Sequence, residues 1–504
     1  MSCVIGIDIG TTSTVGMLVR LPDVALGLES RPVDLSSPHP GWAEENPEQW
    51  WRNVCEITQA LIGKSGIAPR EIAAIGVAGM LPAIVLLDER DHLLRPSIQQ
   101  SDGRCAEEVS ELRFELDETR FAERAGNGIN QQLLAAKTRW IEKHEPDIFA
   151  KVATVFGSYD YINFRLTGEK RVEQNWALEA GITDLRSDTL SASLLAHTHL
   201  ADGVVPPRAR SSEIIGAITT DAATQTGLAA GTPVVGGAAD FVGSGLVSGL
   251  ARRGDCLLKF GGSVDILAVS DEKRPDPRLF LDYHLIPGLY VPNGCMSTGG
   301  SVLNWFADNL AGNADSNAQA AGLSIHQYLD QMASSVAPRA NGVAILPYFL
   351  GEKTPIHDPG ARGAIFGLSL SHGLAHLWRA LLESYAYAIR HHIEVFAATG
   401  LEMVDFRASD GGSHSTTWMQ IVADVIQRPL RLSASHPGSC LGAAWTAAIG
   451  VGAADDWSAV VRLTGESRHI DPNPANADIY SEGYAAFRDL YRRIKDFDDG
   501  GAGD

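Results

Sequence analysis

The sequence predicts an α/β protein made of two related domains, and three observations support this. An apolar, β-branched run at 4–9 stops at a small-residue turn at 10–13 and resumes at 15–19, as in a strand hairpin. The same strand, turn, strand pattern recurs at 256–269, which indicates a duplicated domain. Helical and strand-like stretches alternate through the rest of the chain, which is typical of mixed sheets covered by helices.

The length and glycine distribution place the domain boundary near the middle of the chain. A chain of 504 residues exceeds what one hydrophobic core usually organises. Four glycines cluster between 243 and 254, and we expect the boundary near residues 245–255. We therefore expect an N-terminal domain at 1–248, a C-terminal domain at 249–497 and a flexible tail at 498–504.

Several elements are clear enough to place. A helix is predicted at 46–62, because Asn46 can cap it and Pro47 suits its first position. Helical patterns also cover 374–396 and 415–426. Strands are expected at 73–77 and 84–87, which alternate with these helices.

Composition excludes several classes of protein. The formal charge of −20 comes without any lysine- or arginine-rich block, so nucleic acid is not expected as a partner. The six cysteines are scattered without a CxxC pair, which favours reduced thiols and a cytoplasmic location. The start of the chain lacks the features of a signal peptide, and the apolar uncharged run at 72–87 is too short to span a membrane.

The first turn has the chemistry of a phosphate site. Asp8 ends a strand and is followed by residues small enough for backbone N–H groups to approach an anion: Gly10, Thr11, Thr12 and Ser13. A carboxylate beside phosphates needs a cation between them, so Asp8 implies Mg²⁺. An ordinary β-turn is the alternative for this segment.

Two further turns allow close approach of backbone to a ligand. They are Gly261-Gly262-Ser263 and Gly411-Gly412-Ser413. Each turn alone is a common kind of loop. The prediction of a phosphate-binding site depends on their occurring together with a suitably placed acid.

Asp240 is the candidate for that acid. An apolar strand beginning at Pro233 runs into small residues and ends on this single carboxylate. Phosphoryl transfer to an alcohol needs a group that accepts the hydroxyl proton, and Asp240 is suited to that role. A helix N-cap is the alternative, and the two roles are compatible.

A polar segment at 95–104 is the candidate for polyol recognition. Gln100 and Asp102 are among its hydrogen-bonding side chains. A solvated surface loop would have the same composition.

Taken in this order, the motifs resemble those of the FGGY carbohydrate kinases. The most specific segment is 363–368, followed after seven residues by 376–383, which fits the family's second signature. Lys137 and Trp140 fit the first signature. The resemblance implies two actin-like (ribonuclease H-like) ATPase domains of the hexokinase and actin type, with a cleft between them.

The resemblance also implies roles for individual residues. Asp8 corresponds to the metal-associated acid and Asp240 to the catalytic base. The expected ATP-binding residues are Gly10, Thr11, Thr12, Ser13, Gly261, Gly262, Ser263, Gly299, Gly300, Asn304, Gly411, Gly412 and Ser413. ATP with Mg²⁺ and a small-molecule sugar are the expected partners, and a homodimer is left open.

The sugar loop looks like that of xylulokinases but departs from it. Gln100 and Ser101 replace the usual Trp-Asn pair, and Leu81 follows Met80 where those enzymes have histidine. We expect Met80, Leu81, Gln100, Asp102 and Asp240 to contact the sugar. The expected reaction is ATP-dependent phosphorylation of a pentulose such as D-xylulose.

Other functions stay open from sequence. They are a kinase for ribulose, a glycerol-like polyol or another ketose and, more remotely, a non-catalytic actin-like ATP- and sugar-binding protein. A dehydrogenase is less favoured, because the glycine pattern near Gly243 departs from a dinucleotide-binding fingerprint.

Overall fold

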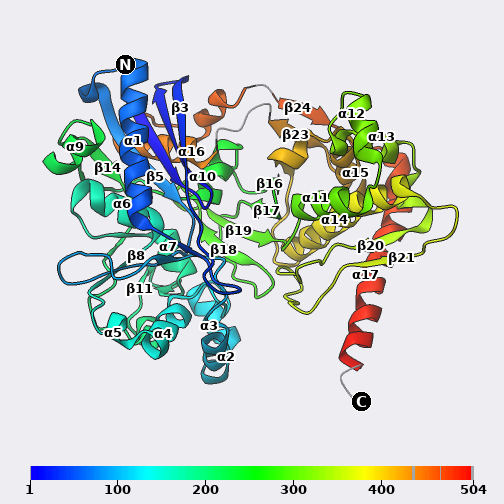
Figure 1. Cartoon of the computed structure of the whole chain (residues 1–504), viewed down its shortest axis with the longest axis horizontal. Helices are drawn as coiled ribbons and strands as arrows, with labels where there is room; N and C mark the ends of the chain where they lie inside the picture. The colour runs from blue at the N-terminus through cyan, green and yellow to red at the C-terminus, as the bar shows by residue number, and fades with distance from the viewer. Residues whose placement is uncertain (1, 434–437, 466, 501–504) are drawn as a thin grey trace. The chain divides into compact units, whose positions relative to one another are not determined.

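The computed structural model describes residues 2–433, 438–465 and 467–500, which form two compact units. The first unit comprises 1–251, 270–292 and 435–465, within those described ranges. The second unit comprises 252–269, 293–434 and 466–504, again within the described ranges. Figure 1 shows strands and helices alternating along the chain in both units.

The first unit is built around one mixed sheet in the order β13-β14-β5-β1-β2-β3, with β15 also paired to β5. The central strands β1 and β5 are parallel, and β1, β2 and β3 form an antiparallel meander. The strands are β1 (Cys3–Ile9), β2 (Ser13–Arg20), β3 (Val24–Pro32), β5 (Ile72–Gly79), β13 (Ile214–Ala217), β14 (Pro233–Val235) and β15 (Ala238–Ala239).

The second unit repeats this topology. Its sheet has the order β19-β17-β16-β22-β23-β24, in which β16 and β17 are antiparallel and β16 is parallel to β22. Each sheet thus continues from a hairpin to two parallel strands and ends on an antiparallel one. Both predicted hairpins and the duplication are confirmed. The strands are β16 (Asp255–Phe260), β17 (Val264–Ala268), β19 (Tyr290–Cys295), β22 (Asp405–Ser409), β23 (Leu430–Ser433) and β24 (Ser467–Ile470).

Helices cover both faces of the first sheet, and glycines let them approach closely (Figure 1). A Cβ on Gly6 of β1 would lie 1.8 Å from the carbonyl oxygen of Cys440 in α16 (Ser439–Gly450). A Cβ on Gly16 of β2 would lie 2.3 Å from Cγ2 of Ile57 in α1 (Pro47–Ser65). Since Gly16 pairs with Ile7, the residue after Gly6, and side chains alternate along a strand, α1 and α16 lie on opposite faces.

The remaining helices and short strands are divided between the same two units. In the first unit they are β4 (Glu44–Glu45), β6 (Val85–Leu87), β7 (Ser97–Ile98), α2 (Ala106–Glu115), α3 (Glu118–Ala125), α4 (Leu134–His144), α5 (Pro146–Phe149), β8 (Thr154–Phe156), α6 (Ser158–Thr167), β9 (Val172–Glu173), α7 (Gln174–Glu179), β10 (Thr183–Asp184), β11 (Thr189–Leu190), α8 (Ala192–Leu195), β12 (Arg208–Ala209), α9 (Thr220–Thr226), α10 (Asp240–Val247) and β18 (Phe280–Tyr283). In the second unit they are α11 (Gly300–Leu310), α12 (Ala314–Ala320), α13 (Ile325–Ser334), β20 (Ala344–Leu346), β21 (Ala364–Phe366), α14 (Leu374–Ala398), α15 (Thr416–Ile426) and α17 (Ala477–Gly500).

The elements placed from sequence are found close to their expected bounds. Asn46 caps α1 by accepting from the Glu48 N–H, as its sequence position predicts. α14 and α15 match the two long helical patterns. α17 continues to Gly500, into the segment expected as a tail, and residues 501–504 lie outside the described ones. No helix among the described residues is long and apolar enough to cross a membrane.

Candidate active site

Three strands of the first unit end side by side and bring the candidate residues of the sequence together. The last residues of β1 and β5, Ile9 and Gly79, are partners in the ladder, and Gly79 also pairs with Ala239 of β15. The Met80 N–H donates to the Ile9 carbonyl at 3.1 Å. Because these strands are parallel, the segments that follow them leave the same edge of the sheet. The turn after Asp8, the sugar candidate Met80 and the acid Asp240 therefore share this edge.

Asp240 begins α10 and does not cap it. Ala239 occupies the N-cap position, and Asp240 is the first helical residue. Its Oδ1 accepts a hydrogen bond from the Phe241 N–H at 2.6 Å. The side chain is partly exposed at the N-terminal end of the helix, where the helix dipole favours a negative charge. A partly exposed carboxylate at this position is accessible to a proton-donating hydroxyl.

The turn after β1 keeps its backbone within reach of a ligand. The Gly10 N–H donates to the Ser13 carbonyl at 3.1 Å and closes the turn. Gly10, Thr11 and Ser13 are partly exposed, and Thr12 is exposed. Asp8 lies inside β1, paired with Val15 and Ala78, so its carboxylate projects from a rigid strand beside the turn.

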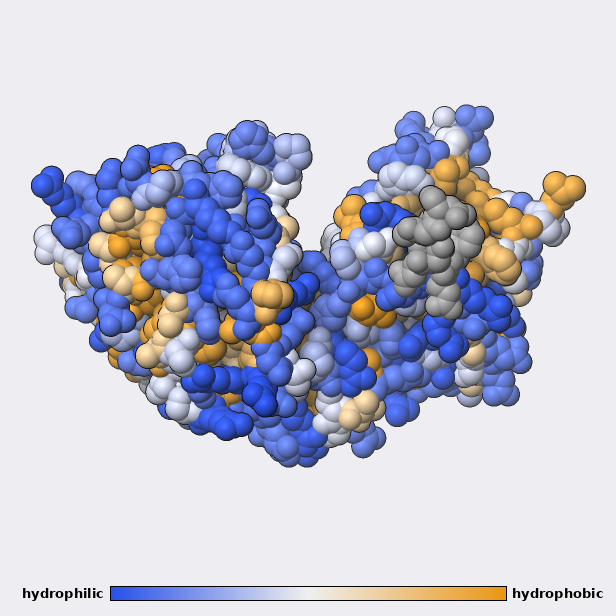
Figure 2. Space-filling model, turned by 90° about the horizontal axis from the view of Figure 1, so that it is seen from below, coloured by the Kyte–Doolittle hydropathy of each residue, from blue (hydrophilic) through white to orange (hydrophobic). Residues whose placement is uncertain are grey.

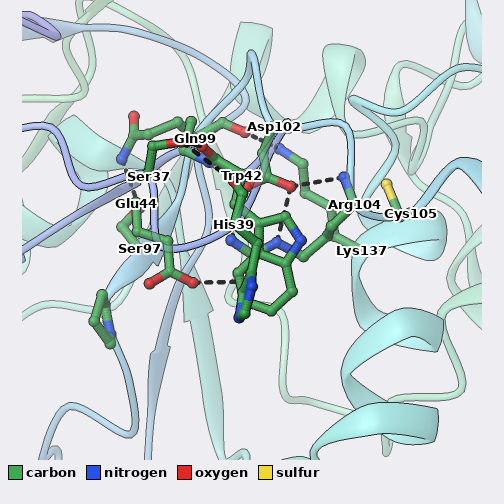
Figure 3. Close-up of polar contacts among 12 residues, drawn as sticks. Ser37, His39, Trp42, Glu44, Ser97, Gln99, Asp102, Arg104, Cys105 and Lys137 are labelled. Atoms are coloured by element: carbon green, nitrogen blue, oxygen red, sulfur yellow. Dashed lines mark hydrogen bonds and ion pairs between the residues drawn. The ribbon is translucent and has the colours of Figure 1, made fainter.

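The sugar loop is organised by a buried carboxylate, shown in Figure 3. Asp102 Oδ2 accepts from the Ala43 N–H at 2.6 Å and from Arg104 Nη2 at 2.7 Å. Its Oδ1 accepts from the Arg104 N–H and Nε. Burial opposes the charge, but the bonds from Arg104 and the Ala43 N–H outweigh it and lower the pKa of Asp102. This fully buried side chain is thus committed to the shape of the loop, and its predicted contact with the sugar stays a prediction.

Arg104 links that carboxylate to further charges and rings. Its Nη1 lies 2.8 Å from Oε1 of Glu44, which also pairs with Arg95. The guanidinium carbon sits 3.7 Å from the ring centre of Trp42, a cation–π contact. Arg104 ends the polar segment at 95–104 that was predicted for the site, but Glu44 and Trp42 were not predicted. Their sequence positions give no signal, because contacts between 42–45 and 95–104 arise only when β4 pairs with β7.

A buried lysine joins the two segments that carry the sugar candidates. Lys137 Nζ, on α4, donates to the Pro82 carbonyl at 2.7 Å and to the Gln99 carbonyl at 3.1 Å. Burial lowers the pKa of Lys137 to about 8. In the sequence, this lysine is only a match to a family signature and has no predicted role. In the structure, its hydrogen bonds link the 80–82 segment to the 99–102 segment.

The remaining sugar candidates lie at the ends of these segments. Met80 and Leu81 are buried, and the Met80 carbonyl accepts from Ser158 Oγ at 2.7 Å. Gln100 Oε1 is buried and accepts no hydrogen bond from any described residue. A buried carbonyl without a donor is costly in a finished core but suits a site that a hydroxyl-bearing ligand completes.

The second unit gathers its three small-residue turns. The Gly300 N–H at the start of α11 donates to the Gly261 carbonyl at 2.9 Å, and the Ser301 N–H donates to the Gly262 carbonyl at 3.1 Å. A Cβ on Gly412 would lie 2.8 Å from Cβ of Phe260, the residue before Gly261. The turns at 261–263, 299–300 and 411–413 are therefore neighbours, as a nucleotide site built from backbone donors requires.

Two further residues, Asn304 and Asp410, lie next to these turns. Asn304 is exposed on α11, one turn after Gly300. Asp410 has φ of 68° and lies 3.8 Å from Lys259 Nζ through Oδ2. Its left-handed backbone turns the chain directly into Gly411.

Comparison with known proteins identifies the family. Models of the N-terminal and C-terminal domains of the FGGY family of carbohydrate kinases match residues 3–247 and 258–451. The chain belongs to the FGGY family of carbohydrate kinases.

Individual relatives agree with this assignment. Xylulose kinase of Escherichia coli strain K12 is 30% identical over 497 residues, 97% of this chain and 99% of that protein. Gluconokinase of Bacillus subtilis strain 168 is 28% identical over 506 residues, 98% of this chain and 96% of that protein. The crystal structure of xylulose kinase from Rhodospirillum rubrum is 53% identical, with a TM-score of 0.93 and coverage of 98% of this chain and 99% of that one.

Family membership confirms the predicted fold class and the general activity. This FGGY kinase has the two-domain α/β fold of the family and is an ATP-dependent carbohydrate kinase. The geometry shows which of its candidate residues lie together within each unit. The roles of the individual residues stay predictions.

Proposed function

We propose that this FGGY kinase phosphorylates D-xylulose, giving D-xylulose 5-phosphate and ADP. The observation that carries the proposal is the 53% identity with xylulose kinase of Rhodospirillum rubrum over 98% of the chain. The Escherichia coli enzyme of the same name supports it at 30% identity.

Asp240 is the general base of the proposed reaction. Its carboxylate accepts the proton of the sugar hydroxyl as that oxygen forms a bond to the γ-phosphorus of ATP. The bond between the γ-phosphorus and the β,γ-bridging oxygen breaks, and ADP leaves with its electron pair. Its place at the start of α10 favours the ionised form that accepts the proton.

The small-residue turns would supply the phosphate contacts, and Asp8 would be the protein's ligand for Mg²⁺. Mg²⁺ is usually held by one or two carboxylates together with substrate phosphates and water, which fits a single strand-end acid. Among the described residues there is no group of three or more His, Cys, Asp or Glu side chains placed to hold a metal. The ATP phosphates would therefore complete the ion's shell, and the ion would neutralise charge on the transferring group.

The charges of the sugar loop favour a neutral ketose over gluconate. Arg95 and Arg104 are both buried and ion-paired with Glu44, and Lys137 is committed to two backbone carbonyls. Each cation of this described cluster thus has a partner inside the loop. A substrate carboxylate would gain no cation there and would lie near the Asp102 and Glu44 charges, whereas the unpartnered Gln100 Oε1 suits a hydroxyl.

The test is a coupled ADP-release assay with D-xylulose, D-ribulose, D-gluconate and glycerol at equal concentrations. D-Xylulose is expected to give the highest kcat/KM, and phosphorus NMR of the product is expected to show a phosphate ester on the C5 hydroxyl. Higher kcat/KM with gluconate or another acceptor would contradict the proposal. ATP binding without sugar-dependent ADP release would indicate the non-catalytic binding protein.

A further inference from the structure

A cavity of about 560 Å³ lies inside the second unit, away from the small-residue turns. The two-stranded sheet of β20 and β21 forms one wall, and helices α14 and α17 form the others. None of the residues predicted to contact ATP lines it. Its volume falls in the range of small-molecule sites, which are mostly apolar with a few polar groups that orient the ligand.

One of its polar groups is a buried hydroxyl. Tyr387, on α14, lines the cavity and is 6% exposed, and its hydroxyl forms no hydrogen bond with any described residue. The hydroxyl packs against the backbone of α17, where a Cβ on Gly483 would lie 2.2 Å from it. A buried hydroxyl without a partner costs free energy, so the cavity wall holds an unmet hydrogen bond.

The second polar group is a carboxylate one turn earlier on the same helix. Glu383 also lines the cavity and is buried. Arg379 Nε, the Arg339 N–H and the Tyr480 hydroxyl all donate to its Oε1, at 2.8, 2.9 and 3.2 Å. These bonds leave Oε2 as an acceptor. Since Arg379 already balances the charge, the carboxylate favours a neutral donor over a second cation.

The rest of the wall is mostly apolar, although Arg339, Ser384, Asp489 and Arg493 also line it, and it continues to the surface. Val343, Ile345, Phe487 and Leu490 face the space together with Ile365 and Phe366, which are 43% and 64% exposed. Figure 2 shows hydrophobic residues reaching the surface of this unit beside hydrophilic ones. A ligand entering here would bury apolar surface and bring any polar group towards α14.

We propose that this cavity binds a neutral, hydroxyl-bearing apolar compound such as an alkylphenol or an aromatic alcohol. The ligand hydroxyl accepts from Tyr387 and donates to Glu383 Oε2, while its apolar body packs against β20, β21 and α17. One hydroxyl can make both bonds because it carries one donor and two acceptor lone pairs. The site is separate from the sugar and the nucleotide, and the proposal does not depend on which sugar is phosphorylated.

The test is calorimetric titration of the full-length protein with 4-propylphenol, in the presence of a saturating non-hydrolysable ATP analogue. Saturable binding is expected, because the analogue occupies a different site. Propylbenzene, which lacks the hydroxyl, is expected to bind about 10-fold more weakly because it meets neither polar group.

Two variants locate the binding. Tyr387→Phe is expected to weaken 4-propylphenol about 5-fold, the size of one neutral hydrogen bond, and to leave the thermal midpoint unchanged or higher. Ala364→Leu adds side-chain volume on β21 inside the cavity and is expected to weaken binding at least about 10-fold. Tyr385→Phe is the matched control on the same helix, since its hydroxyl bonds to Thr298 and its side chain does not line the cavity.

Three results would overturn the proposal. The first is that 4-propylphenol does not bind saturably. The second is that it binds the wild type and both cavity variants with equal affinity. The third is that the ATP analogue displaces it. A dimer by light scattering that excludes the probe until it is diluted to monomer would instead assign the cavity to a second copy of the chain.

Discussion

Replacing Lys137 by methionine tests the most specific feature of the sugar loop. The substitution keeps a long, buried side chain at this position of α4 but removes the ammonium that binds the Pro82 and Gln99 carbonyls. The two segments that carry Met80 and Gln100 then lose their shared anchor. A displacement of about 1 Å in a reacting group can lower the rate about 10²-fold, so we expect a similar loss in kcat/KM for the sugar. KM for ATP is expected to stay unchanged.

The same residue predicts a pH dependence of stability. Burial lowers the pKa of Lys137 from 10.5 to about 8, a difference of about 2.5. At about 1.36 kcal/mol for each pKa unit, the buried charge costs about 3 kcal/mol at neutral pH. Between about pH 8 and 10.5 the unfolded chain binds more protons at this residue, so its contribution to the free energy of unfolding rises with pH. The variant lacks this contribution.

The assay is urea unfolding of both proteins at pH 7.5 and pH 10, together with sugar kinetics at pH 7.5. The stability of the wild type relative to the variant is expected to rise by about 2 kcal/mol between the two pH values, since neither pH lies wholly outside the titration range. Lys151→Met is the control, because Lys151 is exposed and should alter neither quantity. A pH-independent difference, or a normal kcat/KM for the sugar, would refute the reasoning.

Three other substitutions address the remaining groups. Asp240→Asn is expected to lower kcat about 10²- to 10⁴-fold with nucleotide binding retained in a calorimetric titration, and near-normal turnover would remove Asp240 from the mechanism. Gln100→Leu removes the buried Oε1 and is expected to raise KM for the sugar about 10-fold, whereas an unchanged KM would place the sugar elsewhere. Arg104→Met leaves the Asp102 carboxylate buried without its partner and is expected to lower stability by about 3–5 kcal/mol, which denaturant unfolding would detect; a loss below about 1 kcal/mol would contradict the pairing.

The sequence predicts the features that local chemistry determines. The hairpins around Gly10 and Gly261 follow from β-branched runs interrupted by small residues. The start of α1 is predictable because the Asn46 side chain can cap the helix, and in the structure it accepts the Glu48 N–H. The edge that brings Met80 and Asp240 together could be inferred because each follows a strand. Strand order itself needed the structure.

The loop that surrounds Asp102 could not be predicted in the same way. Its carboxylate is recognisable in sequence as polar, and nothing local shows that Arg104 and Ala43 already occupy both oxygens. Similarly, Lys137 is recognisable in sequence only as a match to the family's first signature. Its burial depends on carbonyls 38 and 55 residues away along the chain.

The contact of Gly6 with α16 has a consequence for how the protein is made. Residues 439–450 lie near the end of the chain, yet a Cβ at Gly6 or at Gly76 would collide with the backbone of this helix. A polypeptide ending at residue 251 would expose that glycine-lined face to water, although it contains the whole of the first sheet. During synthesis the first sheet can therefore be completed only after one of the last helices has been made, and an excised first half would need residues 438–465 supplied as a separate peptide.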